Sequence, residues 1–136
     1  MRIFIAHNKG DSSDQIDIVT EWVRATMPEA EVVTGEADWR VRFPQAGGWQ
    51  AWTDAVATGR DVSGRPNYDA FIVSNLSIGR ATAAILGSAL AAGKPVLYVD
   101  VAAGVAEPVQ DVMCVDPQSW KAGYVVRRLV PVGRTT

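Results

Sequence analysis

Two short polar segments of this 136-residue chain carry side chains that could bind or transform a small molecule. Residues 7–13 read HNKGDSS, and residues 74–80 read SNLSIGR. Each contains glycine and leads into a predicted helix, whose free N–H groups favour an anion. The sequence therefore predicts an anion near the N–H groups of residues 77–80, facing residues 7–10. The alternative is that two polar loops simply cap two helices. The predicted ligand-binding residues in these segments are Asn8, Lys9, Gly10, Asn75, Ser77, Gly79 and Arg80.

Three side chains are suited to acid–base or carboxylate chemistry. His7 ends the first predicted strand, and its imidazole can exchange a proton near neutral pH. Asp11 lies in the loop that follows, and Asp100 closes the fourth predicted strand. All three are candidate catalytic residues. The alternative is that the aspartates are turn and cap residues and the histidine a hydrogen-bonded structural group.

The apolar pattern predicts five strands alternating with four helices. We expect strands near residues 2–6, 31–34, 69–74, 95–99 and 111–115. Helices are expected over residues 15–27, 49–58 and 77–92, and from Asp116-Pro117 to just before Pro131. Ser13 or Asp14 is the expected N-cap of the first helix. The alternation predicts an α/β fold: a single flavodoxin-like domain over residues 1–136, with a five-stranded parallel sheet of order 2-1-3-4-5 and helices on both faces.

This strand order determines where a site would lie. Ligands of open parallel sheets bind beyond the carboxyl ends of the strands, at the point where the strand order reverses. That point lies between the first and third strands, where the two polar segments would meet. Asp69 opens the third strand and is therefore expected at the opposite end. Five residues on apolar strands or helical faces are expected in the core: Trp22, Cys114, Trp120, Tyr124 and Leu129.

Composition excludes several classes of protein. The charge sum of 13 basic and 15 acidic residues, −2, gives no general attraction to nucleic acid or to an anionic membrane. A lone cysteine and a lone histidine exclude an intrachain disulfide and a Cys/His zinc cluster. The amino-terminal apolar run is too short for a signal peptide, and no run is long enough for a membrane span. We expect a soluble cytoplasmic domain without a cofactor or metal.

The sequences RIFIAHNKGD and YDAFIVSNLSIGRATAAILGSALAAGKPVLYVD resemble the nucleoside 2-deoxyribosyltransferase-like superfamily. Residues 87–96, GSALAAGKPV, are similar to its helix ending before a GKPV pattern. The same segments look like a TIR domain, whose first strand often reads FISH. Both families share the flavodoxin-like layout and cleave bonds between a ribose and a base. The resemblance implies a nucleoside or nucleotide as ligand.

One departure from these families concerns the catalytic residue. Both place a glutamate on the helix after the third strand, where this chain has Ile85, and the transferases' first-strand tyrosine falls on Phe4. Isoleucine can neither attack a sugar carbon nor stabilise an oxocarbenium ion. Either another carboxylate replaces the missing one, or the chain binds a nucleotide-like ligand without cleaving it.

Residues 35–67 form a Trp/Arg-rich insertion that the resemblance does not cover. Aromatic rings beside arginines can stack a base and hold a phosphate, which makes Trp49 a further ligand-binding candidate and the segment a candidate lid. They can equally form an oligomer contact, or a minor core beneath a long loop. The residues concerned are Trp39, Arg40, Arg42, Phe43, Trp49 and Trp52.

Three hypotheses about function follow. The first is a nucleotide- or nucleoside-binding protein of weak or absent catalytic activity, which we favour because the glutamate is missing. The second is an active N-glycosidic-bond enzyme with a relocated carboxylate. The third is a protein-interaction module that uses the Trp/Arg segment, with homo-oligomerisation as one form of it.

Overall fold

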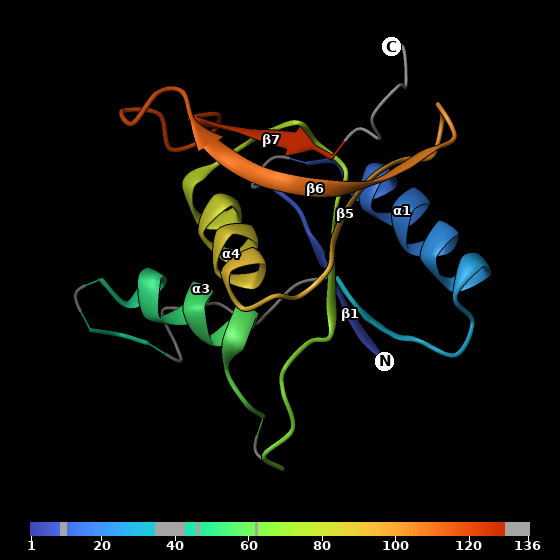
Figure 1. Ribbon diagram of the computed structural model, residues 1–136, viewed down its shortest axis with the longest axis horizontal. Helices are drawn as coiled ribbons and strands as arrows, with labels where there is room; N and C mark the ends of the chain where they lie inside the picture. The colour runs from blue at the N-terminus through green and yellow to red at the C-terminus, as the bar shows by residue number, and fades with distance from the viewer. Residues whose placement is uncertain (9–10, 35–42, 46, 62, 130–136) are drawn as a thin grey trace.

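A single mixed β-sheet organises the chain (Figure 1). The computed structural model describes residues 1–8, 11–34, 43–45, 47–61 and 63–129. Within these residues the fold is α/β, with seven strands in the order β2-β1-β3-β5-β6-β7-β4 and three helices. The strands are β1 (Arg2–Ala6), β2 (Glu31–Val33), β3 (Ala70–Val73), β4 (Ser77–Ile78), β5 (Val96–Asp100), β6 (Val105–Cys114) and β7 (Tyr124–Arg128); the helices are α1 (Ser13–Thr26), α3 (Gly48–Thr58) and α4 (Arg80–Ala91).

The part of the sheet built from β2, β1, β3 and β5 is parallel and has the predicted order. Phe71, Ile72 and Val73 of β3 are all buried, as expected for a central strand without polar alternation. Asp69 lies just before β3, at its amino end, where its carboxylate accepts a hydrogen bond from the N–H of Arg2 at 2.8 Å. The first four predicted strands, their order and the position of Asp69 are therefore confirmed.

The fifth predicted strand is real but does not run parallel to its neighbour. β6 pairs with β5 in the antiparallel direction. A crossover to a parallel neighbour needs a dozen or more residues, whereas only residues 101–104 separate the two strands. These residues form a tight turn that ends at Gly104, whose φ of 67° favours glycine. The purely parallel five-stranded sheet is therefore wrong, and the sheet is mixed.

The predicted last helix is also wrong, because a loop and a strand take its place. The side chain of Asp116 accepts a hydrogen bond from the N–H of Gln118 at 3.0 Å, which makes a turn. The carbonyl of Gly123 then accepts from the N–H groups of Val115 and Asp116 and closes the loop. β7 follows, antiparallel to β6. The Asp-Pro pair that predicts a helix start thus begins a hairpin loop.

Three residues expected in the core are exposed as a consequence. Trp120 lies in the loop and is 57% exposed, and Leu129 follows β7 and is 52% exposed. Cys114 ends β6 and is also exposed. The apolar helical face that would bury the first two does not exist. Trp22 is partly buried against the core beside α1, as predicted.

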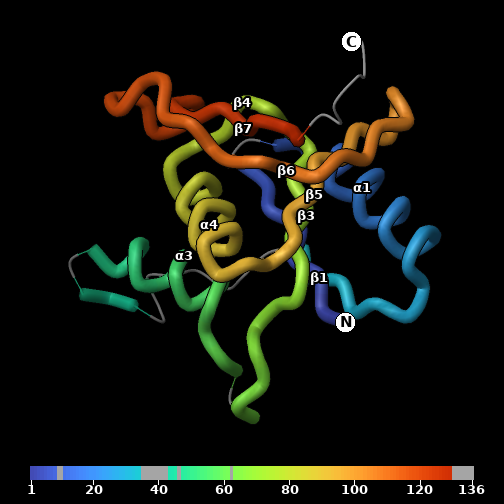
Figure 2. Tube along the Cα trace, in the orientation of Figure 1, coloured from blue at the N-terminus to red at the C-terminus, as the bar shows by residue number. Residues whose placement is uncertain are grey.

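Helices cover both faces of the sheet, as predicted (Figure 2). Alternate residues of the strands point to opposite faces. On one face, the α1 side, Ile5 and Ile72 pack with Val23 of α1. On the other, Phe71 packs in a larger core with residues of α3 and α4, including Leu86. The sheet therefore has a separate hydrophobic core on each of its two faces.

The buried phenol of Tyr98, on β5, makes the stability of the folded protein depend on pH in the alkaline range. Burial raises the pKa of Tyr98 above its ordinary value of 10.0, and the charge of Asp100 raises it further, whereas Arg128 lowers it. As the pH rises, the unfolded chain loses this proton before the folded chain does, so the folded state loses stability above about pH 10. We expect Tyr98→Phe to show a smaller fall in Tm between about pH 9 and pH 11 than the natural chain. An equal fall in both proteins, measured by circular dichroism, would contradict this.

Candidate ligand-binding site

The carboxylate of Asp11 holds the loop after β1. The N–H of Asn8 donates to its Oδ2 at 2.8 Å, and the side-chain amide of Asn75 donates to its two oxygens at 2.9 and 3.0 Å. A carboxylate that accepts these bonds has few acceptor positions left for a ligand. Asp11 therefore ties the β1 loop to the end of β3 and acts as a positioning residue.

Gln15 extends this network onto α1. The N-cap of α1 is Ser12, not Ser13 or Asp14 as predicted, because the Oγ of Ser12 accepts the N–H of Gln15 at 3.1 Å and its backbone is extended. The Gln15 side chain donates from Nε2 to Oδ1 of Asn75 at 3.1 Å. The first turn of α1 and the end of β3 are thus joined side chain to side chain.

Asn8 connects the β1 loop to β4 and α4. Its side-chain amide donates to the carbonyl of Ser77 at 3.2 Å, and its Oδ1 accepts the N–H of Gly79 at 3.0 Å. The N–H of Arg80 donates to the carbonyl of Trp120 at 3.0 Å. Two of the N–H groups at the start of α4 are therefore used within the chain. An anion at this helix start, which the sequence predicts, would have to use the remaining ones and stays a prediction.

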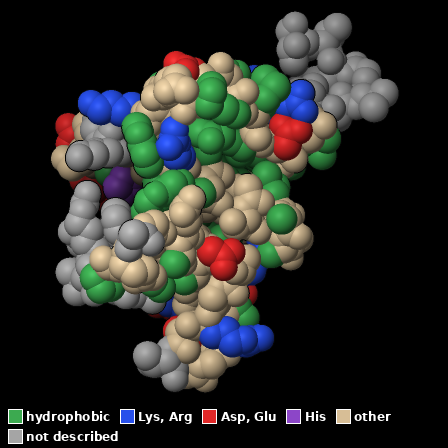
Figure 3. Space-filling model, turned by 90° about the vertical axis from the view of Figure 1, so that its left-hand side faces the viewer, with side chains coloured by type: hydrophobic (Ala, Val, Ile, Leu, Met, Phe, Trp, Pro, Cys, Tyr) green, Lys and Arg blue, Asp and Glu red, His purple; other side chains and the backbone are tan. Residues whose placement is uncertain are grey.

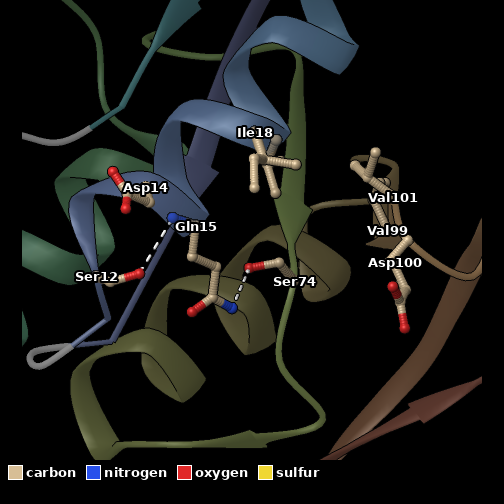
Figure 4. Close-up of a pocket in the computed structure, with 10 residues that line it drawn as sticks. Ser12, Asp14, Gln15, Ile18, Ser74, Val99, Asp100 and Val101 are labelled. Atoms are coloured by element: carbon tan, nitrogen blue, oxygen red, sulfur yellow. Dashed lines mark hydrogen bonds between the residues drawn. The ribbon is translucent and has the colours of Figure 1, made fainter.

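A cavity of about 300 Å³ opens between α1 and the carboxyl ends of β3 and β5 (Figure 4). Gln15 points from α1 toward Ser74, with its Nε2 3.5 Å from the Ser74 Oγ, and Asp100 lies across from them at the end of β5. Ser12 and Asp14 complete the polar lining. We call this space the α1 cavity.

The rest of the lining of the α1 cavity is apolar. Ile18 and Val19 come from α1, and Val99 and Val101 come from the end of β5. Ile18 is 55% exposed, which is unusual for a large aliphatic side chain with a core nearby. Among the described residues, the charged members of the lining are both acids, and none is a lysine or an arginine. The α1 cavity therefore combines an apolar wall with hydrogen-bond acceptors.

Of the three predicted catalytic residues, only Asp100 lines the α1 cavity. Its Oδ1 accepts the N–H of Ala103 at 3.1 Å, and its Oδ2 has no hydrogen-bond partner among the described residues. Nε2 of His7 lies 2.8 Å from the carbonyl oxygen of Thr34. Because a carbonyl only accepts, this nitrogen carries the proton and is occupied. Asp100 is thus the predicted residue that could act on a molecule in the cavity.

Arg80 and Trp49 lie on the other face of the sheet, beside α3 and α4. The guanidinium of Arg80 stacks 3.9 Å from the ring centroid of Trp120, and Trp49 meets the same ring edge-on at 5.5 Å. Both residues line a groove that shares no lining residue with the α1 cavity. The predicted ligand-binding residues therefore form two groups rather than one.

The described part of the Trp/Arg-rich segment packs into the larger of the two cores and does not form a minor core of its own. α3 contributes Val56 and Ala57 to the core on the α4 side, and Trp52 packs against it. This part lies on the face opposite α1 and does not cover the α1 cavity. The remaining predictions for binding residues concern Lys9, Gly10, Trp39, Arg40 and Arg42, which lie outside the described residues.

Ile85, at the position of the families' glutamate, is a core residue. It is 3% exposed and packs in the core on the α4 side. It lines neither the α1 cavity nor the groove beside α4. α4 carries no acidic side chain. This helix therefore supplies no carboxylate to either space.

Sequence reasoning missed the polar residues that α1 contributes to the cavity, Asp14 and Gln15. The first turn of a helix that follows a strand end at the switch point is the signal that could have found them. The prediction considered the loop before α1 and assigned the helix only an apolar face.

Fold and site together define an α/β protein with an acidic, partly apolar cavity at the carboxyl edge of a mixed sheet. Comparison of the chain with protein-family models, with curated proteins and with solved structures finds no match. Among the described residues, no three acidic, histidine or cysteine side chains are grouped so that they could hold a metal ion. No helix in the described ranges is long and apolar enough to cross a membrane.

Proposed function

We propose that the protein binds a nucleoside in the α1 cavity and does not efficiently cleave its glycosidic bond. The observation that carries this proposal is the free Oδ2 of Asp100, opposite Gln15 and Ser74 and beside an apolar wall. A carboxylate at the end of a parallel strand is a suitable acceptor for ribose hydroxyls. The aliphatic side chains of the wall offer a surface for the flat base. A volume of about 300 Å³ is at the lower end of small-ligand sites.

The charge of the cavity favours a nucleoside over a nucleotide. Asp14 and Asp100 are both acids, and none of the described residues that line the space is basic. A phosphate placed between two carboxylates would be repelled, since like charges at short range raise the free energy of the complex. A neutral ligand with hydroxyl donors meets no such penalty.

The proposal of weak or absent catalysis rests on three placements. Ile85 replaces the glutamate and is buried, Asp11 is occupied by Asn8 and Asn75, and His7 does not line the cavity. Asp100 would have to stabilise the sugar cation. The other acid of the lining, Asp14, is exposed and lies on the far side of Gln15 from Asp100 (Figure 4), where it is poorly placed to protonate the leaving base. The free oxygen of Asp100 is also what favours the alternative function, an N-glycosidic-bond enzyme with a relocated carboxylate.

Equilibrium binding tests the site. We expect adenosine or thymidine, titrated calorimetrically, to bind the natural chain more tightly than the corresponding 5′-monophosphate. Asp100→Asn keeps an acceptor for the N–H of Ala103 but removes the charge, and should weaken nucleoside binding about tenfold. Asp17→Asn, on the exposed side of α1, is the matched control and should bind as the natural chain does. Equal nucleoside affinity in all three proteins would remove Asp100 from the site.

A further inference from the structure

The groove beside α4 lies on the face of the sheet opposite α1. Its volume is about 470 Å³, and it runs between α3, α4, β6 and the loop before β7. Trp49 and Tyr124 supply aromatic walls, and Trp120 stands beside them, edge-on to Trp49. Figure 3 shows hydrophobic side chains gathered on this face, with basic side chains among them. We call this space the α4 groove.

Arg80 is held in a fixed orientation at the groove. Its Nη2 donates to the carbonyl of Pro117 at 2.5 Å, while the plane of the guanidinium lies over Trp120. Among the described residues it forms no ion pair, and its remaining side-chain N–H groups have no acceptor. Of the described residues that line the groove, Arg80 is the one with a charge. A guanidinium that is stacked, pre-oriented and short of acceptors is suited to bind an anionic group.

Gly87 keeps the middle of the groove open. A glycine inside a helix costs stability, about 1 kcal/mol relative to alanine. Neither conformation nor packing within the described residues requires it, because its φ is not in the left-handed region and a Cβ there would meet nothing within 4 Å. Ala83 and Ala84, one turn earlier, continue this small-residue floor between the aromatic walls. The small side chains of the floor leave the space between the aromatic walls open.

We infer that the α4 groove binds a planar aromatic molecule carrying one anionic group. The ring would lie over the Gly87 floor between Trp49 and Tyr124, and the anion would pair with Arg80. A carboxylate and a phosphate monoester share this chemistry. The α4 groove differs from the α1 cavity in its face of the sheet, its lining residues and its charge. A test of ligand binding in the groove is therefore independent of a test of nucleoside binding in the cavity.

Three probes that share one ring test the inference: 2-naphthoate, 2-naphthyl phosphate and the neutral 2-naphthamide. In calorimetric titrations of the full chain, we expect at least one anion to bind about tenfold or more tightly than the amide. Comparison of the two anions distinguishes a carboxylate site from a phosphate site. Equal affinity for all three probes, or no binding of either anion, would overturn the inference.

Two substitutions address the two halves of the site. Arg80→Met removes the charge, and Gly87→Leu adds a side chain to the floor at a position where a Cβ meets no described atom within 4 Å. Each should weaken binding of the anionic probe about tenfold, and Gly87→Leu should also raise Tm because it removes a helical glycine. Two variants outside the groove lining are the controls. Lys121→Met removes a nearby charge, and Ala91→Leu enlarges an exposed side chain of α4. Both should leave the affinity for the anionic probe unchanged. Natural affinity in both Arg80→Met and Gly87→Leu would overturn the assignment.

Discussion

Replacing Ile85 by Glu is expected to destabilise the folded protein by about 3–5 kcal/mol rather than to create a glycosidase. Ile85 is 3% exposed in the core on the α4 side, where no described basic residue is among the core residues around it. A carboxylate there would have to lose its hydration or take up a proton. Because small domains are stable by only about 5–15 kcal/mol, the loss would be a large fraction of the total.

Urea unfolding followed by circular dichroism measures this loss. Ala91→Glu, on an exposed position of the same helix, is the matched control and should cost less than about 1 kcal/mol. If Ile85→Glu unfolded at the same urea concentration as the natural chain, position 85 would have to face solvent, and the assignment of this residue to the core would fail.

The second expected result is that the natural chain releases no base from deoxynucleosides, their monophosphates or NAD above the rate in buffer. Loss of a nucleophile or charge-stabilising group costs several powers of ten in rate, on the order of 10³ or more. The placements of Ile85, Asp11 and His7 leave the described lining of the α1 cavity with two acids, Asp100 and Asp14. Asp14 is exposed on the first turn of α1 and lies on the far side of Gln15 from Asp100 (Figure 4). Chromatography of the reaction mixture detects free base directly.

Robust release of base by the natural chain would contradict this result. Its loss in Asp100→Ala, with retention in Asp17→Ala, would then show that a relocated carboxylate does the chemistry. Loss in Asp11→Ala alone, with Asp100→Ala active, would instead move the reaction to the β1 loop. Neither release of base nor binding of nucleoside would favour the interaction-module hypothesis.

The sequence predicted the parallel part of the sheet because its strands are short, buried and without polar alternation. A central strand, covered on both faces, is the element that buries three consecutive apolar residues such as Phe71, Ile72 and Val73. The last third was mispredicted because local signals outweighed pairing between distant residues. Asp116-Pro117 is a good helix start in isolation, but hydrogen bonds from Val115 and Asp116 to Gly123 decide the structure there.

In the candidate site, too, some contacts could be predicted from the sequence and others could not. The sequence predicted that the two polar segments meet, and Asn8, Asp11 and Asn75 do connect them. It could not predict that Arg80 would turn away from that meeting point. Trp120, expected in a core, lies in a loop instead, and its ring packs against the guanidinium of Arg80. Side-chain orientation of this kind depends on the loop before β7, which the sequence assigned to a helix.

The central claim is that the α1 cavity holds a nucleoside, and a crystal structure of the chain soaked with 2′-deoxyadenosine tests it most directly. We expect an intact nucleoside in this cavity, with a sugar hydroxyl within hydrogen-bond distance of Oδ2 of Asp100 and the base against Ile18 and Val99. An empty α1 cavity at saturating nucleoside, or a nucleoside bound only in the α4 groove, would contradict it.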